Sequence, residues 1–350
     1  KQASLCYKKL NMSKKNSSVN LKNIFTKNKD FQFIYLDVKK KLENNKKKIF
    51  LVGISGGPDS LALAAITKII SLDKKFKFYY ALVDHNIRKN SKQEAQKVKK
   101  LLKKFDINLN ILANRIKINK NIQSQARQIR YKLLEDFCHK NGINTVLTAH
   151  NLEDQVETFF IRLSRGSGLT GLSAMMPIRS LNKKIKLVRP LLDTKKLFLI
   201  KISNKVFGKF FLDPSNKDTK YLRTKIRNLK KPLLKSGINY DQIIKSIKNL
   251  ASSKATLDQY LKNILKEVMT KSKEKVLIKS KKFYSFNNEI KIKIINEAIR
   301  KIKKNYYNPR SKKVAGLIAQ LGERNFKKTT LAGCLIYKQK DQICLKKEKF

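Results

Sequence analysis

Residues 55 to 60, with the sequence Ser-Gly-Gly-Pro-Asp-Ser, form a segment suited to hold a phosphate group. They directly follow an apolar run of strand length and directly precede a stretch of helical spacing from about residue 61 to 70. Gly56 and Gly57 let the backbone approach a phosphate closely, and a helix N-terminus offers unpaired N–H groups and the positive end of the helix dipole. The segment therefore predicts an anion-binding turn between a strand and a helix.

The residue types in this loop limit the kind of phosphate site. A Walker loop requires a lysine, whereas this loop has none and carries Asp59 instead. A kinase-type or GTPase-type phosphate cradle is therefore not indicated. The competing interpretation is an ordinary glycine-rich turn in which Ser60 or Asp59 is the N-cap of the helix.

A second group of titratable residues follows an apolar run at residues 143–148. It consists of His150, Glu153, Asp154 and Glu157. On a helix, Asp154 and Glu157 share one face, with His150 one turn before Asp154. The competing interpretation is a solvated acidic helix face, or pairing of Glu157 with neighbours such as Arg162. Because the chain has 25 acidic against 81 basic residues, a functional grouping of these acids is the favoured interpretation.

The elements that position these residues can be predicted from the apolar pattern. Four runs of strand length alternate with stretches of helical spacing, at residues 48–54, 76–83, 109–113 and 143–148. The first two runs show little polar alternation, which is typical of strands buried on both faces of a parallel sheet. This order predicts an α/β domain with a doubly wound parallel sheet, in which ligands bind at the carboxyl ends of the strands.

The same pattern suggests the domain limits. We expect a poorly ordered basic arm at residues 1–30 and a catalytic domain at residues 31–234, which begins with a helix near residues 31–42. Residues 1–11 precede the first methionine, Met12, and are left out of the predicted fold.

The regular pattern ends after Pro232, where a proline, a glycine and several basic residues combine. Residues 235–350 are predicted to form a smaller C-terminal domain. It is expected to be helical at about residues 240–269 and 290–303 and to end in short strands at residues 329–332, 334–337 and 342–345.

The hexapeptide at residues 55–60 resembles the SGGxDS signature of the pyrophosphatase-loop ATPases. Members of this superfamily cleave ATP between the α and β phosphates, transfer AMP to an oxygen and release pyrophosphate. The resemblance implies that the ATP phosphates are held by Ser55, Gly56, Gly57, Pro58, Asp59 and Ser60. Asp59 would lie close to the Mg²⁺ that screens their charge, since this cation prefers carboxylate and phosphate oxygens.

Further motifs are similar to those of the tRNA(Ile)-lysidine synthetase family within this superfamily. The most specific is AHNLEDQVET at residues 149–158, followed by RLSRGSGLTGL at residues 162–172. Other motifs follow in the order of the family: VDHNIR at 83–88, QAR at 125–127 with RY at 130–131, RPLL at 189–192, DPSN at 213–216, and YLR at 221–223 with Arg227. The resemblance covers about residues 49–234, and TLAG at residues 330–333 extends it weakly.

Three positions depart from the family patterns. Asn86 replaces a glycine, Glu153 replaces an aspartate and Thr224 replaces an asparagine. Asparagine tolerates positive φ and Glu153 keeps its charge, so we expect no catalytic assignment to be lost.

The resemblance implies a two-step reaction on the wobble cytidine of a tRNA(Ile) that carries the CAU anticodon. ATP adenylates the C2 oxygen, and the side-chain amine of free L-lysine then displaces AMP at C2 to give lysidine. Asp59, Asp154 and Glu157 are the expected catalytic residues. His150, Asp154 and Glu157 are expected to bind lysine, because its ammonium group needs acidic partners once it leaves water.

The charge balance agrees with a tRNA partner. The net charge is +56 and the pI is near 10.2, which suits a polyanion, although an AT-rich genome would also raise the lysine content of the whole surface. Arginine is the minority cation here, so arginines at motif positions suggest bidentate phosphate contacts. The residues expected to bind tRNA are Arg162, Arg165, Arg223 and Arg227. The C-terminal domain is expected to grip the tRNA outside the anticodon.

Two rival functions stay open, a tRNA 2-thiolation enzyme of the same superfamily and a catalytically inactive RNA-binding relative. Thiolation enzymes rely on a cysteine pair or cluster, whereas Cys138 is the lone cysteine of residues 31–234. The intact loop with Asp59 speaks against an inactive protein. No apolar run approaches the roughly 20 residues of a membrane span, so we expect a soluble, cytoplasmic protein. Its oligomeric state is left open, a homodimer included.

Overall fold

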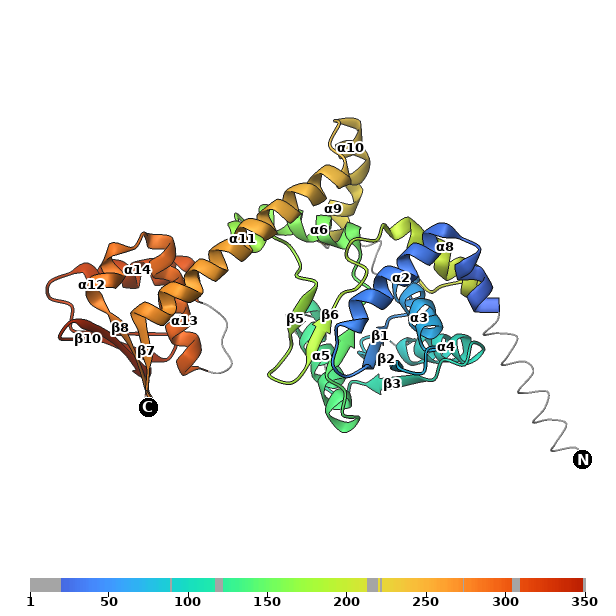
Figure 1. Cartoon of the computed structure of the whole chain (residues 1–350), viewed down its shortest axis with the longest axis horizontal. Coiled ribbons are helices and arrows are strands. Elements are labelled where there is room, and N and C mark those ends of the chain that lie inside the picture. Colours follow the sequence, from blue (N-terminus) through green and yellow to red (C-terminus); the bar gives the residue numbers. More distant parts are fainter. Residues whose placement is uncertain are drawn as a thin grey trace, which may run out of the picture. The chain divides into compact units, whose positions relative to one another are not determined.

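The computed structural model describes residues 20–88, 90–116, 122–212, 220, 222–272, 274–303 and 309–348 (Figure 1). The chain divides into two compact units after Leu250, and each unit has its own hydrophobic core. The division falls within helix α11 (Tyr240–Val268), whereas the sequence pattern placed the boundary after residue 234.

A six-stranded sheet forms the centre of the first unit. Its strands are β1 (Ile49–Ile54), β2 (Lys77–Asp84), β3 (Leu109–Ala113), β4 (Thr145–Leu147), β5 (Ile178–Ser180) and β6 (Lys186–Val188). The spatial order is β3-β2-β1-β4-β6-β5, and the pairs are parallel except for β5 with β6. The order of strands reverses between β1 and β4, where ligands bind in folds of this class. The predicted doubly wound parallel sheet is therefore confirmed, with an antiparallel strand added at one edge.

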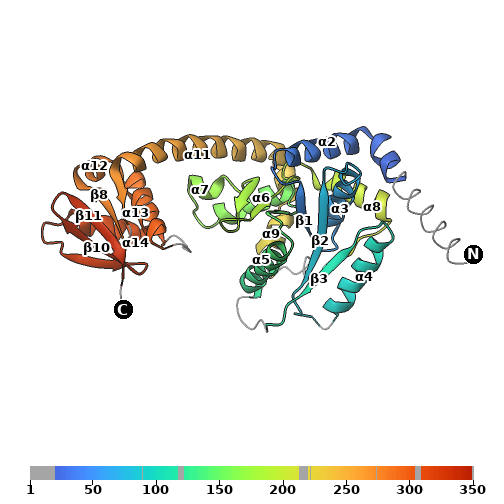
Figure 2. The ribbon, with the colours of Figure 1, turned by 60° about the horizontal axis from the view of Figure 1, so that its bottom comes forward.

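Helices cover both faces of this sheet, as Figure 2 shows for α4 and α5. The helices around it are α2 (Lys29–Glu43), α3 (Pro58–Ile70), α4 (Ser91–Lys103), α5 (Ile122–Lys140) and α8 (Lys196–Phe207). Alternate residues of β1 enter different cores. Phe50 and Val52 pack in the core that includes α3 and α8, whereas Leu51 packs with Leu134 and Cys138 of α5. Burial on both faces explains why β1 is an uninterrupted apolar run.

A smaller group of helices completes the first unit. It comprises α6 (Leu152–Leu163), α7 (Leu169–Leu172), α9 (Leu222–Asn228), α10 (Lys230–Lys235) and the start of α11. Leu152 and Val156 of α6 pack against Tyr240, Ile243 and Ile247 of α11. This apolar contact explains why the first turns of α11 belong to the first unit.

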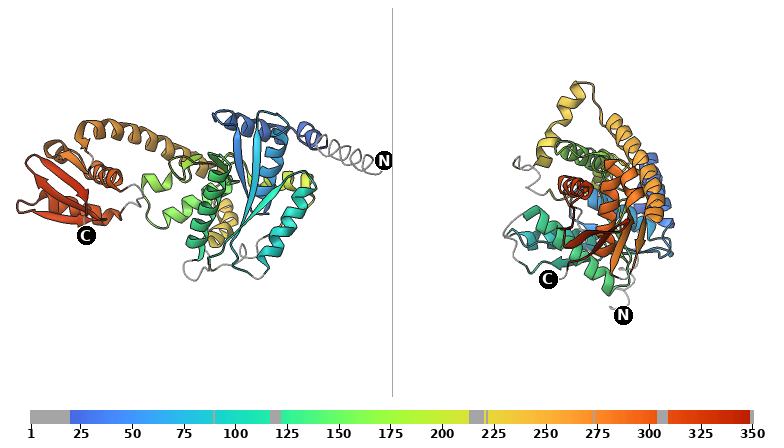
Figure 3. Two further views of the ribbon diagram at one scale, coloured as in Figure 1. Left: turned by 90° about the horizontal axis from the view of Figure 1, so that it is seen from below. Right: turned by 90° about the vertical axis from the view of Figure 1, so that its left-hand side faces the viewer.

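The second unit is a sheet with helices packed on it (Figure 3). Its elements are β7 (Met269–Lys271), β8 (Lys275–Lys279), α12 (Ser280–Ser285), α13 (Asn288–Ile302), α14 (Ser311–Gly322), β9 (Lys328–Leu331), β10 (Cys334–Gln339) and β11 (Gln342–Lys347). The strands pair antiparallel in the order β7-β8-β11-β10-β9. The core contains Ile294 and Ile295 of α13 together with Ile336 of β10 and Ile343 of β11.

Some elements differ from those expected. Residues 20–26 are helical, and Leu21 and Phe25 are buried, so the packed chain begins before residue 31. The DPSN motif at residues 213–216 and Tyr221 lie outside the described residues. In the part of the chain that the structure describes, no helix is both long and apolar enough to cross a membrane.

Candidate active site

Residues 55–60 follow the carboxyl end of β1 and comprise a short turn and the first residues of α3. Gly56 has a φ of 83°, and a Cβ added there would lie 2.7 Å from Cγ2 of Val98, so glycine is required by both conformation and space. The Ser60 hydroxyl accepts a hydrogen bond from the Ser55 N–H (3.1 Å) and donates one to the Gly57 carbonyl (3.0 Å). The loop is thus closed by its own serine.

The helix after this loop begins at Pro58, with Gly57 as its N-cap and no side-chain capping hydrogen bond. Neither Ser60 nor Asp59 is the N-cap, so that part of the alternative interpretation is wrong. Pro58 has no N–H group, and no side chain caps the first turn, so the N–H groups of Asp59 and Ser60 are the ones that can serve an anion at the positive end of the helix dipole.

Asp59 lies in this first turn. Its Oδ1 atom is buried and accepts no hydrogen bond from the described residues, and its Oδ2 atom is 3.6 Å from Nζ of Lys196. Burial raises the pKa of Asp59 from 3.8 to about 6. The Lys196 ammonium and a hydrogen bond from the Asn151 side chain oppose this rise, whereas the nearby carboxylates of Asp154 and Glu153 add to it. At neutral pH the carboxyl group is therefore mostly ionised.

A carboxylate with a buried, unpartnered oxygen fits one ligand position of Mg²⁺. The described residues contain no group of three His, Cys, Asp or Glu side chains that could hold a metal ion. Mg²⁺ commonly binds through one or two carboxylates together with substrate phosphates. Asp59 thus suits a cation that arrives with a polyphosphate.

The acidic residues lie at the start of α6, which follows β4. Asn151 is the N-cap, and a capping box joins it to Asp154: the Asp154 N–H donates to Asn151 Oδ1 (3.0 Å) and the Asn151 N–H donates to Asp154 Oδ2 (3.1 Å). The helix begins at Leu152, so His150 precedes the helix, and the expected position one helical turn before Asp154 is wrong.

Glu157, one turn further along α6, is buried with 4% of its surface exposed. Two arginines of α9 contact its carboxylate: Arg223 Nε at 2.7 Å from Oε2 and Arg227 Nε at 2.6 Å from Oε1. Arg223 also lies 3.4 Å from Asp154 Oδ1. The acids and arginines expected to serve lysine and tRNA separately thus form one mixed cluster.

The other two motif arginines lie apart from this cluster. Arg162 donates through one nitrogen to the carbonyl oxygens of Gly171 (2.6 Å) and Ala174 (2.7 Å), and so holds the α7 segment against α6. The alternative pairing of Glu157 with Arg162 is therefore wrong. Arg165 follows α6 and is exposed.

Two histidines lie among further arginines. His150 hydrogen-bonds through Nδ1 with the Thr148 hydroxyl (3.0 Å), and burial, followed by Arg189 and Arg223, lowers its pKa to about 3. Burial and the guanidinium group of Arg130 lower the pKa of His85 to about 4. Both imidazoles are therefore neutral at pH 7.

The sequence interpretation missed two residues of this region. Arg189, in the RPLL motif, is buried and donates to the Met176 carbonyl (2.6 Å), and its motif was the signal that could have identified it. Lys196 contacts Asp59 by its ammonium group, and its backbone N–H donates to Glu153 Oε2 (2.8 Å). In a chain with this many lysines, no pattern distinguishes Lys196 from the others.

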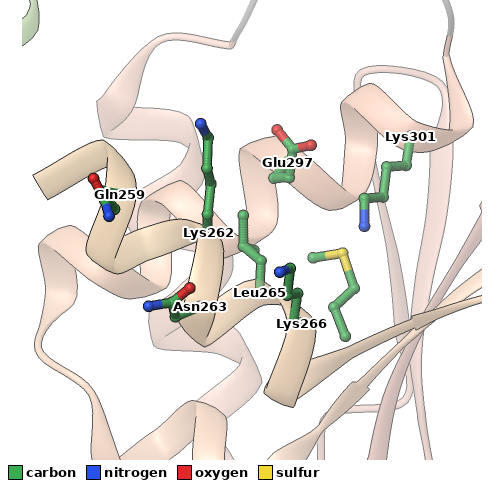
Figure 4. A pocket seen from close by; sticks show the side chains of 8 residues that line it. Gln259, Lys262, Asn263, Leu265, Lys266, Glu297 and Lys301 are labelled. Atoms are coloured by element: carbon green, nitrogen blue, oxygen red, sulfur yellow. The ribbon is translucent and has the colours of Figure 1, made fainter. Parts of the chain in front are cut away.

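The C-terminal unit carries a separate hollow of about 620 Å³ between α11 and α13 (Figure 4). Its lining residues are Gln259, Lys262, Asn263, Leu265, Lys266, Met269, Glu297 and Lys301. This hollow is basic because three lysines and one glutamate line it. The glutamate, Glu297, already pairs with Arg300 at 2.8 Å.

Comparison with known proteins agrees with the geometry. A family model described as a PP-loop domain matches residues 32–234. The chain is 32% identical to a tRNA(Ile)-lysidine synthase of Wolbachia pipientis wMel over 302 residues, which are 85% of this chain and 70% of that protein. It is also 32% identical to a tRNA(Ile)-lysidine synthase of Rickettsia typhi, over 85% of this chain and 69% of that protein.

One solved structure has a similar fold at low sequence identity. The U34-tRNA thiolase NcsA from Methanococcus maripaludis superposes with a TM-score of 0.53 and 17% identity, over 63% of this chain and 78% of that one. This likeness concerns the fold alone.

Proposed function

Because the chain belongs to the tRNA(Ile)-lysidine synthase family of PP-loop proteins, we propose that it joins free L-lysine to the wobble cytidine of a tRNA(Ile) with the CAU anticodon. The observation that carries this proposal is the meeting of a phosphate-binding turn after β1 and an acid–arginine cluster after β4, at the strand-order reversal of the sheet. We expect the enzyme to work in the cytoplasm, where tRNA is found.

In the first step, the C2 oxygen of the cytidine attacks the α-phosphorus of ATP and pyrophosphate leaves. Residues Ser55 to Ser60 hold the phosphates, chiefly through the free N–H groups at the start of α3. Mg²⁺ held by Asp59 and by phosphate oxygens would screen the charge of the leaving group. The buried, unpartnered Oδ1 of Asp59 supports this assignment.

In the second step, the neutral side-chain amine of lysine attacks C2, the bond from C2 to the adenylated oxygen breaks, and AMP leaves. The rest of the lysine is an amino acid, which carries one ammonium and one carboxylate. A cluster that offers Asp154 and Glu157 next to Arg223 and Arg227 can pair with both groups. We propose that lysine enters by exchanging with part of this network, with neutral His150 close by.

The tRNA is proposed to contact basic surfaces of both units. Arg165 is exposed at the end of α6, while Arg162 acts through the α7 segment that it holds. In the C-terminal unit, the hollow lined by Lys262, Lys266 and Lys301 suits phosphates of the tRNA backbone. A homodimer stays a prediction, which light scattering of the purified protein can check.

The proposed reaction predicts which products depend on which substrates. With ATP and tRNA(Ile) alone, pyrophosphate should be released only to the extent of adenylated tRNA, because AMP cannot leave without the amine. Adding lysine should release AMP and allow turnover. Release of AMP that requires a sulfur donor and ignores lysine would support the thiolation rival instead.

A further inference from the structure

Lys196 connects the two halves of the proposed site. Its ammonium lies 3.6 Å from Asp59 Oδ2, in the phosphate-binding turn, and its backbone N–H donates to Glu153 Oε2 at the start of α6. It is the first residue of α8, and its side chain is 36% exposed. No motif in the sequence pointed to it.

The backbone around Lys196 is held firmly. The Leu152 N–H donates to the Thr194 carbonyl (3.0 Å), which ties the chain before α8 to the start of α6. Helix α8 packs along α3 through a shared core that contains Leu199 and Ile202 of α8. The backbone of Lys196 is thus fixed relative to Asp59, whereas its long side chain is only partly buried.

The contact between Lys196 and Asp59 is loose. A separation of 3.6 Å exceeds the distance of a normal N–H···O hydrogen bond, and Asp59 Oδ1 has no partner among the described residues. An ammonium group so near a carboxylate, without satisfying it, can be exchanged for a better partner at little cost.

The phosphate-binding turn itself contains no cation. In a Walker loop, a lysine within the loop reaches the phosphates, but residues 55–60 include no lysine or arginine. Asp59 would bring Mg²⁺, but its own negative charge repels phosphate oxygens. A side-chain cation for the phosphates would have to come from another element. Lys196 of α8 lies 3.6 Å from Asp59, and Arg227 of α9 is close enough to interact with Asp59 electrostatically, although its guanidinium group is already paired with Glu157.

We propose that Lys196 is a phosphate-binding residue of the nucleotide site: its ammonium rests beside Asp59 without nucleotide and moves to a phosphate oxygen when the Mg²⁺-bound nucleotide enters. This inference rests on the proposed function, in that the turn after β1 binds ATP. With Mg²⁺ bound, Asp59 would no longer need the ammonium as its counter-ion, and the ammonium would gain a charge-assisted hydrogen bond to a phosphate oxygen.

The alternative is that Lys196 only neutralises Asp59, and the two interpretations predict opposite effects. If Lys196 contacts phosphate, then removing its ammonium weakens nucleotide binding. If it only neutralises Asp59, it competes with Mg²⁺, and removing it strengthens binding of the Mg²⁺-bound nucleotide or leaves it unchanged.

The test is calorimetric titration of the full chain with Mg²⁺ and an ATP analogue whose α and β phosphates are bridged by a methylene group. Lys196→Met should weaken binding by about 10- to 100-fold, the range for loss of one charged hydrogen bond. Lys196→Arg should recover most of the affinity. The matched control is Lys195→Met, because Lys195 pairs with Asp241 at 2.9 Å and not with the turn.

Unchanged or tighter binding of the analogue by Lys196→Met would overturn the inference. An equal loss of affinity in Lys195→Met would also overturn it, because the effect would then come from the net charge of the region and not from a contact of Lys196. If the unaltered chain does not bind the analogue, the proposed function itself fails, and with it the role of Lys196. The two failures are therefore distinguishable in one experiment.

Discussion

The buried carboxylate of Glu157 in α6 pairs with the partly exposed Arg227 of α9, with 2.6 Å between Glu157 Oε1 and Arg227 Nε. Arg223 contacts the second carboxylate oxygen at 2.7 Å, so one buried charge is held by two cations. The site is therefore neutralised internally without any substrate, and a charged amino acid can enter only by exchanging partners within it.

The first prediction concerns lysine recognition. Glu157→Gln removes the charge at nearly constant volume, and losing a carboxylate partner for a desolvated ammonium typically costs about 2 to 5 kcal/mol. The lysine concentration needed for half-maximal activity should rise by about 30-fold or more, while ATP affinity changes little. Adenylated tRNA should accumulate at low lysine, which gel or mass analysis of the tRNA can detect.

A double substitution separates this role from stability. Glu157→Gln removes the carboxylate that both arginines contact, so their positive charges are less well compensated. Adding Arg227→Gln removes one of these two charges. The double variant should regain thermal stability relative to the single one but not the lysine affinity. An unchanged lysine requirement in both variants would remove Glu157 from the lysine site.

The second prediction concerns the phosphate-binding turn. Asp59→Ala should abolish the conversion of ATP to pyrophosphate and leave tRNA binding nearly intact, because the carboxylate is proposed to serve Mg²⁺ and not the tRNA. Asp73→Asn is a suitable control, since Asp73 follows the opposite end of α3 and pairs with Lys39. Turnover of Asp59→Ala within a few-fold of the original would contradict the assignment.

The third prediction links Asp59 to stability. Its pKa in the folded protein is about 6, above the ordinary 3.8, so the folded state favours the protonated form. The stability that this proton contributes is fully present below about pH 4 and is lost as the pH rises through 6. Asp59→Asn should therefore stabilise the protein at pH 8 by about 1 to 3 kcal/mol, and by much less at pH 4. Denaturant unfolding at both pH values measures the difference, and equal effects at both would show that burial does not penalise the charge.

The fourth prediction concerns the cysteines. Cys138, Cys334 and Cys344 are buried as free thiols, and burial is the main cause that raises the pKa of each, so none is an activated nucleophile. Replacing all four cysteines by serine should lower stability but preserve lysine transfer to tRNA at a permissive temperature. Loss of activity with Cys138→Ser alone, in a protein that is still folded, would favour sulfur chemistry.

The fifth prediction concerns the hollow of the C-terminal unit. Lys262→Gln with Lys266→Gln should weaken tRNA binding and reduce the slope of log affinity against log salt by about 2, because two phosphate contacts are lost. Nucleotide binding should not change. The matched control is Lys312→Gln with Lys313→Gln, two exposed residues of α14. An equal loss of tRNA affinity in this control would mean that only the net charge of the unit matters, and not the hollow.

The sequence predicted the sheet well because its strands are buried on both faces. Leu51 and Phe50 point to different cores, so β1 had to be an apolar run. Asn86, a residue type expected to tolerate positive φ, has a φ of 51°. Strands β5 to β8 were missed, and three of them have only three residues, too few to show a period.

The contacts within the site could not be predicted to the same degree. Arg223 follows Glu157 by 66 residues, and no spacing rule joins residues so far apart. The family motifs identified both residues, but we expected Glu157 to bind lysine and Arg223 to bind tRNA. The position of Lys196 beside Asp59 depends on how α8 packs on α3. This packing cannot be deduced from the local sequence pattern.

The most direct test of the central claim is mass analysis of a tRNA(Ile) with the CAU anticodon after incubation with the protein, ATP and lysine. We predict that the wobble cytidine gains the mass of one lysine less one water, and that omission of either ATP or lysine prevents the gain. An unmodified cytidine, or an increase that matches replacement of oxygen by sulfur, would contradict it.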